Sequence, residues 1–322
     1  MILIATNKED ITADLVVLRF RERNVRYARF NTEDFPQQVG LTWTIRQQDS
    51  NVRLRLPIAH IDLADVSAIW FRRPVSPKID RSVGDSAARD FAEGESVAAL
   101  RNLWAHFGGF WVSHPTRIAA AEQKLVQLAE AARNGLDTPE TMLTTCPADA
   151  RAFIEAHRDV VAKPLKRGYI EHDGHASVIY TTVLADQDRT RLDEVQFAPT
   201  LFQERIPRGF DLRVTVVGRT VFATEIKSGL APEAEVDWRR LDPAALHHTP
   251  HTLPPQIEAS VLGLLRSFGL QFGALDFIVR PDGRYVFLEV NPNGQWAWIE
   301  QLIGTPISSA IADLLMGRAE RL

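Results

Sequence analysis

The chain has 322 residues, 45% of them hydrophobic and 24% charged, with a formal net charge of −4 at pH 7. This is the composition of an ordinary globular protein, long enough for two or three hydrophobic cores. The negative charge argues against a general nucleic-acid binder, the single cysteine, Cys146, excludes an internal disulfide, and no apolar run approaches membrane-spanning length. We therefore expect a cytoplasmic protein with no nucleic-acid or membrane partner.

The first part of the chain is typical of a small α/β domain. A strand over 2–6, a helix over 11–23 and a second strand over 25–30 form a β-α-β opening, which predicts a parallel sheet. No G-x-G-x-x-G follows the first strand, so a dinucleotide-binding fold is not supported. Polar residues then continue to about Pro57 without an assignable pattern.

A further strand, over 66–71, ends in two arginines, Arg72 and Arg73. The carboxyl edge of a sheet in an α/β domain is where ligands usually bind, so the two side chains are candidates for substrate binding. The alternative is a solvated basic pair, and these residues alone do not decide between the two. A long helix over 87–107 follows, and the segment 110–115 leaves this domain.

Two lysines stand out in the middle of the chain. Lys124 lies in an Ala-rich helix predicted over 117–134, with Gly135 as its C-cap. Lys163 ends an apolar strand over 159–163. Because a lysine at the end of a buried strand is costly unless it binds an anion, Lys163 is a phosphate candidate. A polar loop with two glycines follows, and a strand is predicted over 178–184.

Several strands are predicted after residue 200. The segment 200–207 indicates a strand leading into a linker, and 211–217 with 221–227 indicates a hairpin. Its alternating charges are typical of the solvated face of an antiparallel sheet. Three histidines in the segment 247–251, which is expected to be a loop, lack partners at a recognised zinc spacing. Helices are predicted over 255–268, where Gly269 is the expected C-cap, and over 307–316.

The last two strands carry the most informative polar residues. Glu289 and Asn291 lie two apart in a strand over 285–291, so they share one face and offer the oxygen ligands that Mg²⁺ prefers. The preceding strand, over 272–280, carries Asp276. If the connecting loop is Pro281 and Asp282 alone, Asp276 lies opposite Phe287 and on the face of Glu289. A three-residue loop would turn Asp276 away. Taken in isolation, these acids also fit the solvent side of an ordinary hairpin.

Taken together and in chain order, these residues resemble the ATP-grasp ligases. In that family a nucleotide lies between two antiparallel sheets of an α/β fold. The resemblance implies that the two lysines hold phosphates, that the 203–206 hinge contacts adenine, and that two Mg²⁺ ions are bound. The implied positions are, in order, Lys124, Lys163, Gln203, Glu204, Ile206, Asp211 at the ribose, Arg213 at the phosphates, Asp276, Glu289 and Asn291.

The sequence is most similar to the ATP-grasp maturases of ribosomal peptides, the graspetide or microviridin-like group. The motifs that carry this resemblance are Ile69-Trp70-Phe71-Arg72-Arg73-Pro74, Asp237-Trp238-Arg239, Gly273-Ala274-Leu275-Asp276-Phe277 and Phe287-Leu288-Glu289-Val290-Asn291-Pro292-Asn293-Gly294-Gln295-Trp296. Small-molecule ligases of the superfamily typically carry N-x-x-P-G after the glutamate. Pro292-Asn293-Gly294-Gln295 departs from that pattern, which argues against the D-alanine and glutamate-adding ligases.

This resemblance implies an enzyme that acts on a precursor peptide with a leader and a core. ATP would activate an Asp or Glu side chain as an acylphosphate, and a Lys, Ser or Thr side chain would attack it, giving a macrolactam or macrolactone. Arg213 and Lys227 are candidates to hold the acylphosphate, and Arg72, Arg73 and Arg239 to contact the peptide. The alternative role for Arg72 and Arg73 is to stabilise the domain interface. A ligase for free amino acids or small amines and a non-catalytic, nucleotide-responsive peptide binder are the alternatives.

The resemblance also implies the organisation and the assembly of the protein. We expect three α/β parts: an N-terminal domain over 1–115, a central lid domain over 116–202, and a C-terminal domain with the metal site over 203–322. A homodimer is expected from the family. The sequence leaves open the ester or amide nature of the bond, the number of rings, the leader motif and the acceptor's general base.

Overall fold

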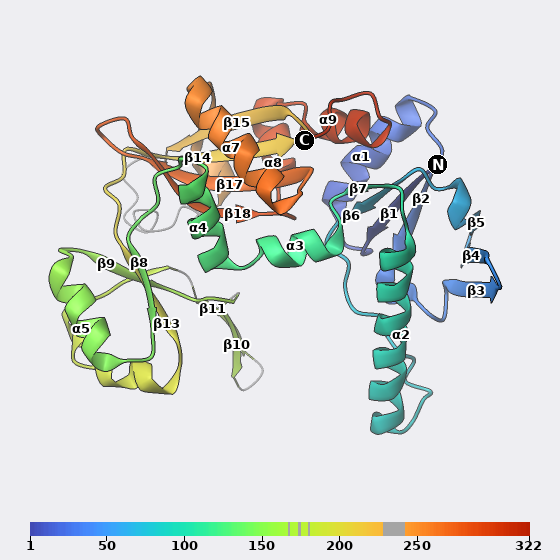
Figure 1. The fold of residues 1–322 in the computed structure, drawn as a ribbon, viewed down its shortest axis with the longest axis horizontal. Coiled ribbons are helices and arrows are strands. Elements are labelled where there is room, and N and C mark those ends of the chain that lie inside the picture. Colours follow the sequence, from blue (N-terminus) through green and yellow to red (C-terminus); the bar gives the residue numbers. More distant parts are fainter. Residues whose placement is uncertain (167, 173–174, 180, 228–241) are drawn as a thin grey trace.

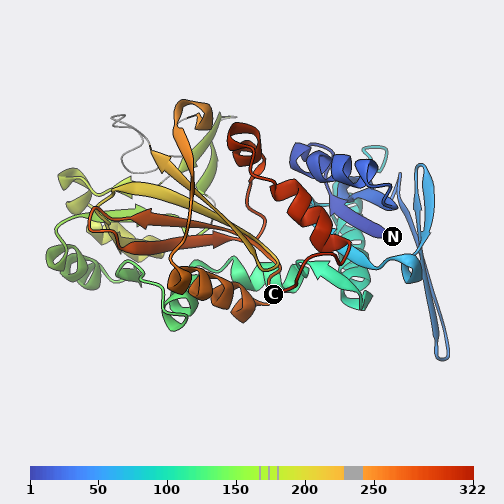
Figure 2. The same cartoon turned by 90° about the horizontal axis from the view of Figure 1, so that it is seen from above.

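The computed structural model describes residues 1–166, 168–172, 175–179, 181–227 and 242–322. Figures 1 and 2 show an elongated molecule, with a parallel sheet at the N-terminal end, a large antiparallel sheet in the middle, and a smaller sheet at the other end. Within the described ranges, no helix combines the length and the apolar character needed to cross a membrane.

The N-terminal sheet has the strand order β2-β1-β6-β7, and all of its strands are parallel. Alternate residues of the first strand face two different cores, Ile2 and Ile4 one of them and Leu3 and Ala5 the other. The prediction of a β-α-β opening is confirmed. The elements are β1 (Ile2–Thr6), α1 (Ile11–Glu22), β2 (Tyr27–Asn31), β6 (Ala68–Phe71), α2 (Ser86–His106) and β7 (Phe110–Val112).

The polar stretch that gave no assignable pattern forms an antiparallel meander of three strands. Its two longer strands make a hairpin that projects from the N-terminal end (Figure 2). Val52, Leu54 and Leu56 alternate with exposed residues and bury one face against the domain core. The strands are β3 (Gly40–Arg46), β4 (Asp49–Leu56) and β5 (Ala59–Asp62).

The smaller sheet, at the end of the molecule opposite the N-terminal sheet, is formed by the middle of the chain and is called the central sheet below. It has the order β12-β9-β13-β8 and is antiparallel. The predicted strand over 178–184 is wrong as a single element, because its residues belong to two strands of different sheets, β11 and β12. The elements are β8 (Thr141–Thr144), α5 (Pro147–Ala156), β9 (Val160–Lys163), β10 (Gly168–His172), β11 (His175–Ile179), β12 (Thr182–Val183), α6 (Asp186–Arg189), a 3₁₀ helix (Leu192–Phe197) and β13 (Thr200–Glu204).

The C-terminal sheet is antiparallel in the order β16-β15-β14-β17-β18. The predicted hairpin is confirmed, whereas the histidine segment is an edge strand and not a loop. An edge position accommodates Pro250, because a proline has no N–H to donate to a second neighbour. The strands are β14 (Phe210–Val217), β15 (Thr220–Lys227), β16 (His247–His251), β17 (Phe272–Val279) and β18 (Tyr285–Asn291), and a 3₁₀ turn (Pro243–Ala245) precedes β16.

Three helices cover one face of this sheet. They are α3 (Pro115–Ala121), α4 (Lys124–Arg133) and α7 (Pro255–Phe268), and they share one core with β14, β17 and β18. The single helix predicted over 117–134 is therefore wrong. It breaks at Glu122 and Gln123, and the Gln127 side chain donates to the Ala121 carbonyl at the end of α3. The glycine caps after α4 and α7 are confirmed, with positive φ angles.

The last two helices join the C-terminal sheet to the N-terminal sheet. They are α8 (Ala297–Ile303) and α9 (Ile307–Leu315), and α9 contacts both α1 and β14. One core accordingly contains residues of β1, α1 and the C-terminal segments. The domain limits at 115 and 202 stay a proposal. In the structure, β13 runs across the second limit, and α3 and α4 pack on the C-terminal sheet.

Candidate functional site

A cleft of about 1890 Å³ lies between the central sheet, the C-terminal sheet and the loops of the N-terminal sheet. It brings together most of the site residues predicted from the sequence and described by the structure. Those that line it are Lys124, Lys163, Gln203, Glu204, Ile206, Asp211, Asp276, Glu289, Asn291 and Arg73.

The two carboxylates on β17 and β18 face each other, but by a different register from the one predicted. The backbone amide of Arg280 donates to the Arg284 carbonyl, so the loop between them has three residues. Phe277 accordingly lies opposite Phe287. A β-bulge at Leu288 then shifts the pairing, and Asp276 lies opposite Glu289. The predicted pairing of Asp276 with Phe287 is wrong. The bulge brings Asp276 back to the face of Glu289, which the longer loop alone would not do.

Asp276 and Asn291 are held by further hydrogen bonds. Both oxygens of Asp276 accept from Nη1 of Arg213, each at 2.8 Å. The side-chain oxygen of Asn291 accepts from the Asn293 amide at 3.0 Å. Asp276 is 7% exposed, so its charge is balanced by the guanidinium and not by water. The arrangement fixes an all-oxygen donor set on one strand face.

A glutamine that the sequence analysis missed holds the strand between the two β18 residues. Gln127, on α4, donates to the Val290 carbonyl at 2.8 Å and accepts from the Val290 amide at 2.9 Å. Its side chain therefore replaces a neighbouring strand at the edge of the sheet. Its position one turn after Lys124 on the same helix is the signal that could have identified it.

The two predicted phosphate lysines line the cleft from different elements, α4 and β9. Nζ of Lys124, at the first turn of α4, donates to the Pro164 carbonyl at 2.6 Å. Nζ of Lys163, at the end of β9, donates to Oε1 of Gln203 at 2.5 Å. Both side chains are half-buried, and both line the same cleft. The cleft thus contains two ammonium groups together with the carboxylates of the C-terminal sheet.

The predicted hinge forms the wall between the two sheets. The Glu204 amide donates to the Glu140 carbonyl, and Gln203 also donates to the Thr141 hydroxyl. Ile206 packs with Ile278, Val286 and Leu288 in a small apolar cluster. Three members of this cluster, Ile206, Ile278 and Leu288, line the cleft and give it an apolar surface.

Asp211, at the start of β14, is 4% exposed and pairs with Arg208 at 3.3 Å. Arg213 lies two residues further along the same strand, is also buried, and is directed at Asp276 and the Gln295 carbonyl. Its predicted direct contact with phosphate stays a prediction. Lys227, at the exposed end of β15, pairs with Glu225 at 2.5 Å, and its role also stays a prediction.

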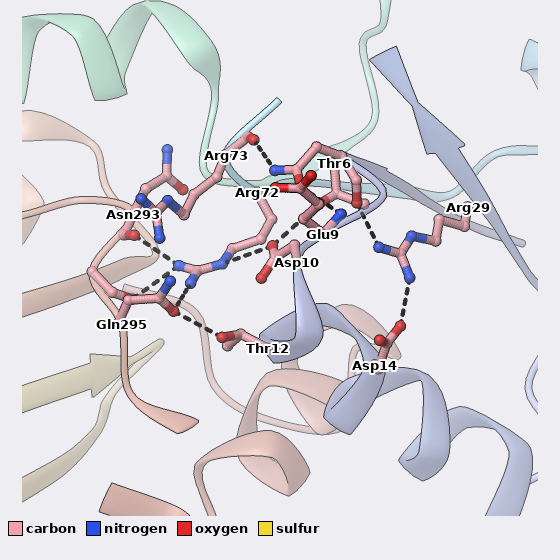
Figure 3. Close-up of polar contacts among 12 residues, drawn as sticks. Thr6, Glu9, Asp10, Thr12, Asp14, Arg29, Arg72, Arg73, Asn293 and Gln295 are labelled. Atoms are coloured by element: carbon pink, nitrogen blue, oxygen red, sulfur yellow. Dashed lines mark hydrogen bonds and ion pairs between the residues drawn. The ribbon is translucent and has the colours of Figure 1, made fainter. Parts of the chain in front are cut away.

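The two arginines after β6 have different environments. Arg72 is 1% exposed, and burial lowers its pKa to about 10, an effect opposed by the charge of Asp10. It bonds Asp10 and the loop over 293–295 (Figure 3), so it lies inside the protein and not at a peptide surface. Arg73 has a positive φ of 48° and lines the cleft. Arg239 lies outside the described residues.

The donor set of the cleft fits a hard divalent cation. Asp276, Glu289 and Asn291 offer two carboxylates and an amide oxygen on one wall, the ligand types that Mg²⁺ prefers. No group of three or more His, Cys, Asp or Glu side chains in the described ranges is arranged to hold a metal by itself. The amide oxygen and ligands from a bound nucleotide would therefore be needed to complete a coordination shell.

The chain is similar to known proteins over nearly its whole length. Residues 1–119 match the family described as the MvdD pre-ATP grasp domain. The chain is similar to a RiPP-associated ATP-grasp ligase of Chryseobacterium gregarium, solved with ADP and a leader and core peptide. Identity is 32%, with 99% of this chain and 97% of that chain covered and a TM-score of 0.93. No curated protein matches the chain.

Two macrocyclases of Microcystis aeruginosa MRC are also similar over nearly the whole chain. MdnC, solved with the precursor peptide MdnA, has 32% identity and a TM-score of 0.87, with 99% of this chain and 100% of that chain covered. MdnB has 30% identity and a TM-score of 0.80, with 98% of each chain covered.

The fold and the cleft between its two antiparallel sheets define the chain as an ATP-grasp protein, as predicted. At this identity and coverage, the chain belongs to the family of ATP-grasp ligases associated with ribosomally synthesised and modified peptides, which includes these macrocyclases.

Proposed function

We propose that the protein is an ATP-dependent ligase that closes carboxyl side chains of a ribosomal precursor peptide onto Lys, Ser or Thr side chains. The observation that carries the proposal is that two lysines and an Asp-Glu-Asn oxygen set line the same cleft. Family membership supports the peptide as substrate, because the C. gregarium ligase was solved with a leader and core peptide and MdnC with its precursor.

The residues of the cleft suit phosphoryl transfer from ATP to a carboxylate. A carboxylate is a poor electrophile until its oxygen is phosphorylated, and the reaction develops negative charge that cations must balance. Lys124 and Lys163 would hold the phosphates, and Ile206, Ile278 and Leu288 offer an apolar surface for adenine. ADP bound to the C. gregarium ligase supports ATP as the co-substrate.

Asp276, Glu289 and Asn291 would hold Mg²⁺, which neutralises phosphate charge and orients the γ-phosphoryl group. We propose two ions. Arg213 fixes Asp276 in place, and the contact of Arg213 or Lys227 with an acylphosphate is part of the proposal. The remaining wall, formed by loops of the N-terminal sheet with Arg73, is the side on which the peptide would enter.

The bond types and the assembly belong to the same proposal. We propose ester or amide closure with release of ADP and phosphate, a homodimer as expected from the family resemblance, and action in the cytoplasm, where precursor peptides are made. Light scattering of the purified chain tests the dimer, since a single species of monomer mass would contradict it.

The intact mass of the precursor peptide encoded beside this protein tests the activity. The peptide is incubated with the protein, ATP and Mg²⁺, and with the same mixture lacking ATP as control. We expect the loss of one water for each bond formed, as intramolecular condensation requires. A mass gain with ATP consumption would indicate ligation of a free amino acid or amine. Unchanged mass with tight peptide binding would indicate a non-catalytic peptide binder.

A further inference from the structure

The loop that follows the metal-ligand strand is held from the N-terminal domain by a buried arginine. Nη1 of Arg72 donates to the carbonyls of Asn293 and Gly294, at 2.8 and 2.9 Å, and Nη2 donates to Oε1 of Gln295 at 2.7 Å. Nε faces Asp10 at 3.3 Å. Figure 3 shows this guanidinium between the end of β6 and the 293–295 loop.

The same loop is held on its other side by the C-terminal sheet. Nη2 of Arg213 donates to the Gln295 carbonyl at 3.2 Å, while Nη1 of Arg213 bonds Asp276. Gly294 leaves room for this approach, since a Cβ at that position would lie 2.8 Å from Nη2 of Arg213. The segment therefore lies between two guanidinium groups that come from different sheets.

The position of this loop determines the position of a candidate metal ligand. The Asn293 amide donates to the side-chain oxygen of Asn291, and the Gly294 amide donates to the Asn291 carbonyl. These are the residues whose carbonyls Arg72 bonds. A shift of the loop thus moves or releases the Asn291 side chain.

The burial and the hydrogen-bonding geometry of Arg72 exceed what a residue would need merely to connect two domains. Its side chain is almost completely buried, which disfavours its charge, and Asp10 is the carboxylate it pairs with. Its planar fork reaches two carbonyls and an amide oxygen at once, which a lysine ammonium on a flexible stem does not reproduce. Asp10 is itself oriented by the Thr6 hydroxyl, and Thr12 donates to the same oxygen of Gln295.

We propose that Arg72 is a positioning residue for the metal site. From the N-terminal domain it fixes the 293–295 loop, and through that loop it fixes Asn291 for binding of a nucleotide-bound divalent cation. The inference rests on the proposed function, because it needs the metal site assigned there. It gives the N-terminal domain a part in nucleotide binding that does not require any of its residues to touch the nucleotide.

The test compares binding of ADP with and without Mg²⁺ by calorimetry, using the full chain. Arg72→Lys keeps the positive charge beside Asp10 but removes the fork. In EDTA we expect the variant to bind ADP as the wild type does. In Mg²⁺ we expect its affinity for ADP to be about 10- to 100-fold lower than that of the wild type, the usual effect of altering a residue that orients a metal ligand.

Arg23→Lys is the matched control. Arg23 also joins the N-terminal domain to the C-terminal part, by bonds to Asp313 and Ser309 of α9, but it does not contact the 293–295 loop. We expect this variant to keep the full Mg²⁺ effect. An equal loss in both variants, or a folded Arg72→Lys protein with the wild-type Mg²⁺ effect, would overturn the inference.

A second variant covers the case in which Arg72→Lys does not fold. Gln295→Met removes the oxygen that accepts from Arg72 and Thr12 and should reduce the Mg²⁺ effect in the same direction. An unchanged Mg²⁺ effect in that variant would also contradict the inference. Failure of the wild type itself to bind ADP would overturn the proposed function.

Discussion

Glu289 lies opposite Asp276 on the neighbouring strand and next to the cleft. Replacing Glu289 with Gln keeps its size and removes the negative charge that a divalent cation requires. We expect peptide-dependent ATP turnover to fall by at least about 100-fold, the order of a lost electrostatic contact to the transition state. Peptide binding should be retained, as measured by fluorescence anisotropy of a labelled precursor.

Glu93→Gln is the control for this charge change, since Glu93 is exposed on α2, away from the cleft. It should leave both turnover and peptide binding unchanged. If Glu289→Gln turned over ATP as fast as the wild type, the assignment of the metal ligands would be wrong.

Gly294 permits a close approach that no other residue allows. A Cβ there would lie closer to the Ala274 side chain than real Cβ atoms approach, and 2.8 Å from Nη2 of Arg213. Gly294→Ala should therefore displace Arg213 and weaken ADP binding in Mg²⁺. Gly94→Ala has open space around it on α2 and should instead stabilise the protein by about 0.5–1 kcal/mol, measured by chemical denaturation. Normal Mg²⁺-dependent binding by Gly294→Ala would contradict this account.

At the scale of elements, α4 contributes to two parts of the site. Lys124 at its first turn lines the cleft, and Gln127 one turn later bonds both backbone groups of Val290. Gln127→Met keeps the volume but removes the side-chain partner of the Val290 amide and of the Val290 and Ala121 carbonyls. We expect a loss of about 2 kcal/mol or more in the free energy of unfolding, because each orphaned group costs about 1–3 kcal/mol.

This variant should also weaken ADP binding in Mg²⁺, since the strand that carries Glu289 and Asn291 is no longer held at its edge. Gln256→Met, at an exposed position in the first turn of α7 and outside the cleft, is the control and should change neither property. A Gln127→Met protein as stable as the wild type would show that the edge of β18 needs no such partner.

Most elements could be predicted from the sequence, because hydrophobic periodicity and caps are local signals. The helix over 255–268 with its Gly269 cap and the hairpin of β14 and β15 are confirmed on this basis. The bulge at Leu288 could not be predicted, since the local pattern of β18 carries no signal for an extra residue in the pairing. The edge strand over 247–251 was missed because Pro250 weakens the strand signal.

At the scale of the whole molecule, the cleft residues were predicted through a resemblance in chain order, because spatial proximity is not encoded in any short segment. Arg72 shows the limit. Its place at a strand end was predicted, but its burial depends on how the N-terminal sheet docks on the 293–295 loop. The sequence does carry a signal for the ion pair of Arg72 with Asp10. The two residues follow β1 and β6, which are adjacent parallel strands, so their side chains could have been expected to meet.

The contribution of His248 to the stability of the whole protein should decrease on mild acidification. Burial lowers the pKa of His248, which lies on β16 beside the Trp298 ring at 5.1 Å. In the unfolded chain this histidine takes up a proton at a higher pH than in the folded protein. The stability contributed by the neutral ring is thus fully present above the ordinary His pKa of about 6.5. It is lost as the pH falls through the pKa of His248 in the folded protein.

Thermal unfolding at about pH 7.5 and about pH 5.5, on either side of the ordinary His pKa, measures this effect. His248→Gln removes the titrating ring and should make the decrease in melting temperature between these two conditions smaller. His60→Gln, at an exposed position on β5, should leave the decrease as it is in the wild type. If His248→Gln lost as much stability on acidification as the wild type, protonation of this histidine would not be what destabilises the fold, because the only change between the two proteins is the group that titrates.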